Sequence, residues 1–179
     1  MHPHSPADIA YRARHLAWLL FDVDGVLTDG RLFYGSKGET WKIFDVRDGL
    51  GMKLAQRDGL KVGILSGRGN EALQNRAREL GLDALFMNRR DKSAAFDEFL
   101  AEHGVEPAQI AYAGDDLPDL PVLLRCGLSF CPADARPEVR ERVDVVLETR
   151  GGQGAARELC ERVLRARGSW DGLVAEFLV

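Results

Sequence analysis

The chain has few cysteines, and none of them is spaced as a disulfide framework or a zinc site requires. Its 179 residues include Cys126, Cys131 and Cys160, an odd number with no CxxC pair. Disulfide-rich folds and structural zinc sites depend on cysteines that recur in pairs at short spacing. We therefore expect three structural thiols and a reducing, cytoplasmic setting.

Long apolar runs and an excess of positive charge are also missing. No stretch approaches the ~20 apolar residues of a membrane span, and Asp22 interrupts the first apolar run, which a signal peptide would need intact. Lys and Arg number 24 against 28 Asp and Glu, a net charge of −4. This balance disfavours nucleic acid or an acidic membrane as a partner, because both bind basic surfaces. The four histidines share no spacing typical of metal ligands.

Short apolar runs alternate with segments of helical periodicity along the chain. The runs predicted as buried strands are Ala17–Asp22, Lys61–Ser66, Ala84–Met87, Ile110–Ala113, Leu128–Cys131 and Val143–Leu147. The predicted helices are Leu50–Arg57, Asn70–Leu80, Lys92–His103, Leu117–Arg125, Pro137–Arg142 and Ala155–Arg167. Gly81 and Gly104 stand where C-caps are expected. The alternation predicts an α/β fold, a doubly wound parallel sheet in one domain over residues 1–179.

Two segments fall outside this alternation. Residues 30–45 hold two β-rich runs around Gly35-Ser36-Lys37-Gly38, the signature of a β-hairpin inserted after the first strand. In the tail, residues 168–179, apolar side chains recur at helical spacing. They predict a face packed on the chain's own core or on a neighbouring subunit, and they are Trp170, Leu173, Val174, Phe177 and Leu178.

Polar side chains gather where the predicted strands end. These are Asp22-Val23-Asp24 after the first strand, Ser66-Gly67-Arg68 after the second, Lys92 after the third, and Asp115, Asp116 and Asp119 after the fourth. Each group alone also fits an ordinary turn or helix cap. In an open parallel sheet, however, the carboxyl ends of the strands share one edge, where ligands bind. Carboxylates crowded at that edge repel one another, and an oxygen-preferring dication such as Mg²⁺ relieves the repulsion.

Four motifs in this order resemble those of the haloacid dehalogenase-like phosphohydrolases. They are "DVDGVLTDG", "LSGR", Lys92 and "GDDLPD", and the resemblance covers nearly all of the chain. It implies a Rossmann-like core, with Asp22 as the nucleophile and Asp24 as the general acid/base. It also implies that the Asp22 carboxylate, the Asp24 carbonyl and Asp115 hold Mg²⁺.

The same resemblance assigns the groups that bind the transferring phosphoryl group. Ser66 and Lys92 would grip it, and Asp119 would orient Lys92. An aspartyl-phosphate intermediate on Asp22 divides one difficult displacement into two easier ones. Because side chains alternate along an extended chain, Asp22 and Asp24 face the same side, so one can attack phosphorus while the other protonates the leaving oxygen.

Between the first two strands there is room only for the hairpin and one helix, so the chain lacks the cap domain that usually closes such sites. The pattern "GVLTDGRLFY…GE…K.F.VRDGLGMKLA" and the segment "RGGQGAARELCERVL" resemble the 3-deoxy-D-manno-octulosonate 8-phosphate phosphatase family. This resemblance implies a capless homotetramer in which neighbouring subunits cover each other's sites, acting in lipopolysaccharide biosynthesis. The "GGQG" stretch fits the glycine-rich loop of that family and a plain turn before the last helix equally well.

A sugar acid phosphate carries a carboxylate, which favours a bidentate cation in the site. Arg68 is the first candidate because it follows the phosphate-binding Ser66 and Gly67, and Thr28 and Arg47 come after it. The predicted substrate-binding set is therefore Ser66, Gly67, Arg68, Thr28, Arg47 and Lys92.

Three other functions compete with this one. A sialic-acid-type nonulosonate 9-phosphate phosphatase has a similar sequence and a similar substrate. A phospho-accepting receiver module also uses acids, a hydroxyl and a lysine on an α/β sheet, but its central strand ends in an aspartate, whereas here it ends in Ser66. A silent oligomerisation module is disfavoured by the complete set of motifs.

Overall fold

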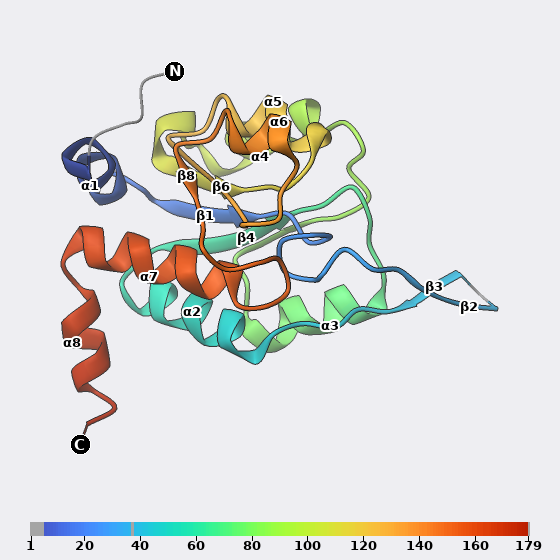
Figure 1. Cartoon of the computed structure of the whole chain (residues 1–179), viewed down its shortest axis with the longest axis horizontal. Coiled ribbons are helices and arrows are strands. Elements are labelled where there is room, and N and C mark those ends of the chain that lie inside the picture. Colours follow the sequence, from blue (N-terminus) through green and yellow to red (C-terminus); the bar gives the residue numbers. More distant parts are fainter. Residues whose placement is uncertain (1–5, 37, 179) are drawn as a thin grey trace.

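A central sheet of six strands forms the body of the computed structural model, which describes residues 6–36 and 38–178 (Figure 1). The strands are β1 Trp18–Phe21, β4 Lys61–Leu65, β5 Ala84–Phe86, β6 Ile110–Ala113, β7 Leu128–Cys131 and β8 Val145–Val146. They lie in the order β5-β4-β1-β6-β7-β8, and every neighbouring pair is parallel. The parallel sheet predicted from the sequence is thus confirmed. His2 and His4 lie outside the described residues.

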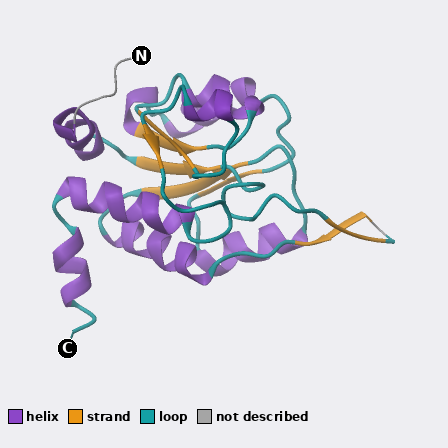
Figure 2. Cartoon of the chain, in the orientation of Figure 1, coloured by secondary structure: helices purple, strands orange, loops and turns teal. Residues whose placement is uncertain are grey.

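Helices cover both faces of this sheet, as the doubly wound prediction requires (Figure 2). They are α1 Pro6–Arg14, α2 Val46–Arg57, α3 Glu71–Leu80, α4 Lys92–His103, α5 Leu120–Leu123, α6 Pro137–Arg140, α7 Ala155–Arg167 and α8 Trp170–Ala175, with 3₁₀ turns η1 Pro107–Gln109 and η2 Leu117–Asp119. Helices α2, α3 and α7 lie on one face and α4, α5 and α6 on the other (Figure 1). Helix α1 packs against α7.

Strand β1 shows why both faces need a cover. All four of its side chains are buried, and they divide between two apolar clusters. Leu19 and Phe21 pack with residues of α2 and α7, whereas Trp18 and Leu20 pack with residues of α4 and α5. Successive side chains of a strand point to opposite faces, so an uninterrupted apolar run is what a strand between two helical layers needs.

The order of the strands fixes where a ligand can bind. Counted along the chain, the strands of the sheet lie in the order 3-2-1-4-5-6, with β1 between β4 and β6. The connection after β1 leads to β4 on one side and the connection after β6 leads to β7 on the other, and these diverging loops open a crevice at the carboxyl ends of the strands. The residues after β1, β4 and β6 therefore line one crevice.

Local chemistry explains where the helices differ from prediction. Helix α2 begins at Val46, before the predicted Leu50, because the Asp45 side chain caps it by accepting a hydrogen bond from the Arg47 amide. The predicted helix Leu117–Arg125 is instead η2 followed by α5, with Pro118 and Pro121 each in a first turn, where proline is tolerated. Gly81 and Gly104 are left-handed C-caps, as predicted. Helix α1 was not predicted.

The inserted hairpin is present and forms its own two-stranded antiparallel sheet. Strands β2 Phe33–Gly35 and β3 Gly38–Trp41 stand away from the body, on the side opposite α1 and α8 (Figure 1). Lys37 of the predicted turn lies outside the described residues. The apolar side chains Leu32, Phe33, Trp41 and Ile43 are exposed, Trp41 by 70%. Phe44, predicted with them, instead packs against the main core.

The tail packs on the chain's own core, one of the two arrangements that the sequence left open. Trp170 and Leu173 of α8 belong to the main apolar cluster and Val174 packs against it, while Phe177 and Leu178 are exposed. Among residues 6–36 and 38–178, no helix has the length and apolar character needed to cross a membrane.

Candidate active site

Backbone hydrogen bonds carry the strand ladder past the strand ends and so fix the first site residues. The Asp22 amide donates to the Ala113 carbonyl at 2.9 Å, and the Ser66 amide donates to the Phe86 carbonyl at 2.8 Å. Because β4 and β6 flank β1, the residues that follow these strands lie beside Asp22. Rigid strand ends of this kind can hold side chains in a fixed geometry for chemistry.

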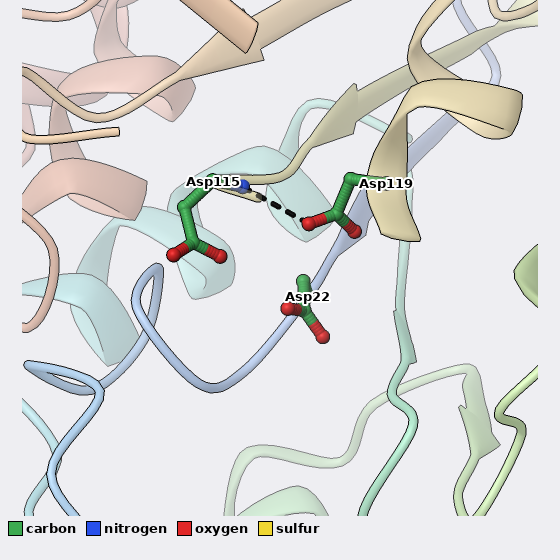
Figure 3. Close-up of side chains that lie close together, drawn as sticks. All are labelled: Asp22, Asp115 and Asp119. Carbon is green, nitrogen blue, oxygen red and sulfur yellow. Dashed lines mark hydrogen bonds between the residues drawn. The ribbon is translucent and has the colours of Figure 1, made fainter. Parts of the chain in front are cut away.

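Three carboxylates meet in the crevice. Asp22 follows β1, whereas Asp115 and Asp119 follow β6, and each offers an oxygen within 4.8 Å of the others. Figure 3 shows the three side chains close together. The sequence predicted that Asp22 and Asp115 converge, and the structure confirms that convergence.

Both carboxylate oxygens of Asp119 accept hydrogen bonds. Oδ1 accepts from the Lys92 ammonium and the Tyr112 hydroxyl at 2.5 and 2.6 Å. Oδ2 accepts from the amides of Asp115 and Asp116 at 3.1 and 3.2 Å (Figure 3). Because four donors use the lone pairs of Asp119, Asp22 and Asp115 are the carboxylates left to bind a cation.

Lys92 is the countercharge in this group. It is the first residue of α4, only 5% exposed, and its Nζ lies 2.9 Å from Asp22 Oδ1 as well as beside Asp119. Burial lowers the pKa of Lys92, but the carboxylates of Asp22 and Asp119 outweigh it, so the pKa lies above its ordinary value. The ammonium therefore stays charged and donates toward the space where Asp22 points.

One ammonium does not balance three carboxylates. Burial, partly offset by Lys92, raises the pKa of Asp22 to about 7. Burial, with the charges of Asp119 and Asp22, raises the pKa of Asp115 to about 8. Within the described ranges, no group donates a hydrogen bond to the Asp115 carboxylate. A cluster of carboxylate oxygens whose negative charge exceeds the positive charge beside it fits a divalent cation that prefers oxygen ligands, as Mg²⁺ does.

Glycines let the loop after β1 lie directly against this cluster. A Cβ on Gly25, whose φ is +93°, would stand 2.1 Å from Asp115 Oδ2. A Cβ on Gly151 would stand 1.8 Å from the Gly25 carbonyl oxygen, and the Gly152 amide donates to the Val26 carbonyl at 3.0 Å. The "GGQG" stretch thus packs its backbone directly against the loop that carries Asp22 and Asp24. Its last glycine, Gly154, is also the N-cap of α7.

The loop after β4 places Ser66 inside and Arg68 outside. Ser66 is buried, and its Oγ accepts from the Arg68 amide at 3.3 Å. Gly67 turns the chain between them. The Arg68 guanidinium is 51% exposed and reaches the hairpin, where it lies 3.4 Å from the Tyr34 hydroxyl and 3.9 Å from Glu39 Oε2. Arg68 therefore stands between the site and the hairpin.

Thr28 and Arg47 are engaged within the chain's own loops. The buried Thr28 hydroxyl donates to the Val23 carbonyl at 3.3 Å and accepts from the Gly30 amide at 3.2 Å. Arg47 pairs with Asp45 at 2.6 Å and donates to the Gln153 carbonyl at 2.8 Å. Arg47 thereby connects the start of α2 to the glycine-rich stretch.

Two site residues were missed in the sequence. Tyr112 is fully buried in β6, where its hydroxyl donates to Asp119 and lies 3.3 Å from the Lys92 ammonium. The available signal was a hydroxyl between the two alanines of the apolar strand "IAYA". Lys42 contacts Asp24, whose side chain turns toward the hairpin. Its signal was the lysine in the pattern "GE…K.F" that carries the family resemblance, to which no role was assigned.

Comparisons with known proteins agree with this geometry. A family model for haloacid dehalogenase-like hydrolases matches residues 84–159. The chain is 40% identical over 165 residues to the 3-deoxy-D-manno-octulosonate 8-phosphate phosphatase of Escherichia coli strain K12, covering 92% of this chain and 88% of that protein. It is 43% identical over 157 residues to the phosphatase of the same name from Haemophilus influenzae, covering 88% and 87%.

Solved structures give the same result. The fold is similar to that of the 3-deoxy-D-manno-octulosonate 8-phosphate phosphatase of Moraxella catarrhalis, which was crystallised with a magnesium ion, a phosphate ion and a KDO molecule. The TM-score is 0.91 at 35% identity, covering 95% of this chain and 98% of that one.

The carboxylate cluster predicts how the metal-free protein responds to pH. Asp22 and Asp115 hold protons more tightly in the folded chain than unfolded, where their pKa is ~3.9, so stability in EDTA should fall as pH rises from about 4 to 8. Asp115→Asn removes one of these charges. At pH 8 it should raise the free energy of unfolding by at least ~1.4 kcal/mol, the value of one pKa unit.

Urea unfolding in EDTA at several pH values measures this effect. Asp171→Asn, which removes an exposed carboxylate on α8, is the matched control and should change nothing. An Asp115→Asn protein as pH-sensitive as the unmodified chain contradicts the expectation.

Proposed function

The chain belongs to the 3-deoxy-D-manno-octulosonate 8-phosphate phosphatase family of haloacid dehalogenase-like hydrolases, and we propose that it hydrolyses that sugar acid phosphate. The products are 3-deoxy-D-manno-octulosonate (Kdo), for lipopolysaccharide biosynthesis, and inorganic phosphate. The observation that carries the proposal is the buried Asp22–Lys92 pair beside Asp115, at the switch point of the sheet. A carboxylate nucleophile, a cation for the phosphoryl group and a cation-binding acid thus stand together.

The proposed reaction has two displacements on phosphorus. An oxygen of the Asp22 carboxylate bonds to phosphorus while the bond from phosphorus to the sugar oxygen breaks, and Asp24 gives that oxygen its proton. Water then attacks the phosphorus of the aspartyl phosphate. Asp24 accepts a proton from this water, and Asp22 is released with inorganic phosphate.

The proposed cofactor is Mg²⁺, held by the Asp22 carboxylate, the Asp24 carbonyl and Asp115. When bound, it supplies positive charge that offsets the repulsion between the Asp22 carboxylate and the phosphate. Lys92 and Ser66 bind the phosphoryl oxygens. Asp119 does not take part in binding the ion in this proposal, because its hydrogen bonds hold the Lys92 ammonium toward Asp22.

Arg68 is the residue proposed to bind the carboxylate of the substrate. Its exposed guanidinium stands at the mouth of the site, next to the phosphate-binding Ser66 and Gly67, and its planar fork suits a carboxylate. Thr28 and Arg47 complete the proposed set, although their present partners lie within the loops.

We further propose that the chain is one domain and acts in the cytoplasm as a homotetramer. In the part of the chain that the structure describes, no cap domain covers the site, and the hairpin exposes Leu32, Phe33, Trp41 and Ile43. A two-stranded hairpin is marginal in water, and a group of exposed apolar side chains is typical of an interface. Hairpins that contact one another in the assembly would shield adjacent sites from solvent.

The rival functions have less support. The relatives compared above are octulosonate 8-phosphate phosphatases, which does not favour a nonulosonate 9-phosphate as substrate. A silent oligomerisation module has no use for a buried lysine held between a strand-end aspartate and a second acid. A phospho-accepting receiver also uses a lysine beside acids, but the relatives compared above are phosphatases, which does not favour it. Turnover of an aryl phosphate with Mg²⁺ separates an enzyme from both modules.

Removing the nucleophile should abolish turnover without unfolding the chain. Asp22→Asn is nearly isosteric and relieves repulsion, so phosphate release should fall at least about a thousandfold while the circular dichroism spectrum is unchanged. Asp115→Asn should instead weaken Mg²⁺ binding and regain part of its activity at high Mg²⁺. Substantial turnover by Asp22→Asn at any Mg²⁺ concentration is the result that would refute the assignment.

Arg68 should discriminate between substrates by their carboxylate. Arg68→Ala should lower kcat/KM for octulosonate 8-phosphate roughly ten- to a hundredfold more than for p-nitrophenyl phosphate, since only the sugar acid has a carboxylate to lose. Arg68→Lys should recover part of the loss, because an ammonium lacks the planar fork. Arg165→Ala, on the surface of α7, is the matched control. A higher kcat/KM for a nonulosonate 9-phosphate would replace the proposed substrate.

Assembly should depend on the hairpin. Light scattering should give four times the chain mass of 19.8 kDa, and Trp41→Glu should dissociate the assembly by placing a charge on its apolar contact. Tyr11→Glu, an equally exposed aromatic on α1, is the control and should leave the mass unchanged. A monomer at concentrations where the protein is active is incompatible with the proposal.

A further inference from the structure

The carboxylate of Asp24 is held by a lysine that comes from the hairpin. Lys42, the residue that follows β3, places its Nζ in contact with Asp24 Oδ1 and 2.6 Å from Glu39 Oε1. The Lys42 side chain is only 1% exposed. An ammonium withdrawn from water to this extent needs anionic partners, and Asp24 and Glu39 are the two that it has here. When Asp24 carries the proton that it donates, Glu39 remains as the anion that balances Lys42.

Glu39 joins this pair to the loop that carries Arg68. Glu39 Oε1 accepts from the Asn70 amide nitrogen at 3.4 Å, and Oε2 lies 3.9 Å from the Arg68 guanidinium. A continuous line of charged contacts therefore runs from Asp24 through Lys42 and Glu39 to the mouth of the site. The hairpin, which Figure 1 shows standing away from the sheet, is tied to the crevice at its base by these contacts.

Asp24 needs such support because the strand ladder does not hold it. Asp22 continues the ladder of β1 through its hydrogen bond to Ala113, whereas Asp24 lies two residues further on, in the loop. A carboxyl group that transfers a proton must come within about 2.6–3.2 Å of the oxygen it serves. Something outside the loop must therefore fix the Asp24 side chain, and Lys42 is the group in contact with it.

We propose that Lys42 is a positioning residue for the proton transfers of Asp24, and that Glu39 in turn holds Lys42 in place. This inference rests on the function proposed above, in which Asp24 protonates the leaving oxygen. It adds a requirement that the hairpin supply part of the acid/base apparatus. The nucleophile Asp22 is held by Lys92 instead, so the nucleophile and the acid/base have separate supports.

The inference predicts that the loss of rate in Lys42 variants depends on the leaving group of the substrate. A sugar alkoxide must be protonated as it leaves, whereas p-nitrophenolate leaves without a proton. At saturating substrate, Lys42→Met should lower the pre-steady-state rate of leaving-group release, which reports the first displacement alone, roughly 10- to 100-fold for octulosonate 8-phosphate, the effect of a misplaced catalytic group. It should lower that rate for p-nitrophenyl phosphate by less than about threefold, whereas the second displacement, in which Asp24 is the base, should slow for both substrates.

Four further variants complete the experiment. Lys42→Arg keeps the charge and should recover part of the loss, and Glu39→Gln should show a weaker loss with the same substrate preference. Asp24→Asn is the reference for a missing acid and should lose far more on the sugar phosphate than on the aryl phosphate. Lys61→Met, at the opposite edge of the sheet, is the matched control and should change neither rate.

The outcomes separate the inference from the function on which it rests. If Asp24→Asn shows the leaving-group preference and Lys42→Met slows leaving-group release from both substrates equally, or from neither, the positioning role of Lys42 is overturned and the function stands. If Asp24→Asn itself shows no preference, or the unmodified chain hydrolyses neither substrate, the proposed function fails and the inference with it. If Lys42→Met does not fold, Lys42→Arg and Glu39→Gln decide by the same comparison.

Discussion

The site depends on the contact of one buried ammonium with two buried carboxylates. Lys92 lies between Asp22 and Asp119, and the four hydrogen bonds to Asp119 fix that arrangement. A buried ion pair is costly unless its remaining donors and acceptors are satisfied, and here Tyr112 and two backbone amides satisfy them. Because Asp115 lies outside this balance, the crevice keeps a surplus of negative charge. A bound cation would therefore stabilise the folded chain at the pH where these carboxyl groups lose their protons, in addition to its part in the chemistry.

Much of the fold and part of the site could be predicted because both follow from short-range rules. Apolar runs such as Trp18–Phe21 mark buried strands, and the parallel-sheet rule brings their ends together, so the convergence of Asp22, Asp115 and Lys92 followed from spacing. The contact between Lys42 and Asp24 could not be predicted in this way. It depends on how a hairpin folds back on its base, which neither periodicity nor spacing encodes. Tyr112 escaped notice because a strand tyrosine usually belongs to the apolar core.

Rigidity is distributed unevenly around the crevice. On one side the Gly151–Gly152 stretch lies in backbone contact with the loop after β1, with no room for a side chain between them. On the other side Lys42, which follows the hairpin, meets the same loop through the charged end of a long side chain. The first contact fixes where the carboxylates stand. The second depends on how the hairpin is held, so in the proposed function the acid/base side of the crevice is the one that the proposed subunit association would adjust.

The position of β1 also governs how the chain is made. This apolar strand lies near the N-terminus, yet its partners are Lys61–Ile64 on one side and Ile110–Ala113 on the other. During synthesis at ~5–20 residues per second, β1 leaves the ribosome roughly 5–18 s before its second neighbour exists. Throughout that interval four large apolar side chains and an unpaired strand edge are exposed, a condition that favours aggregation. The central placement that makes β1 the site of chemistry thus makes it the segment most in need of a chaperone in the growing chain.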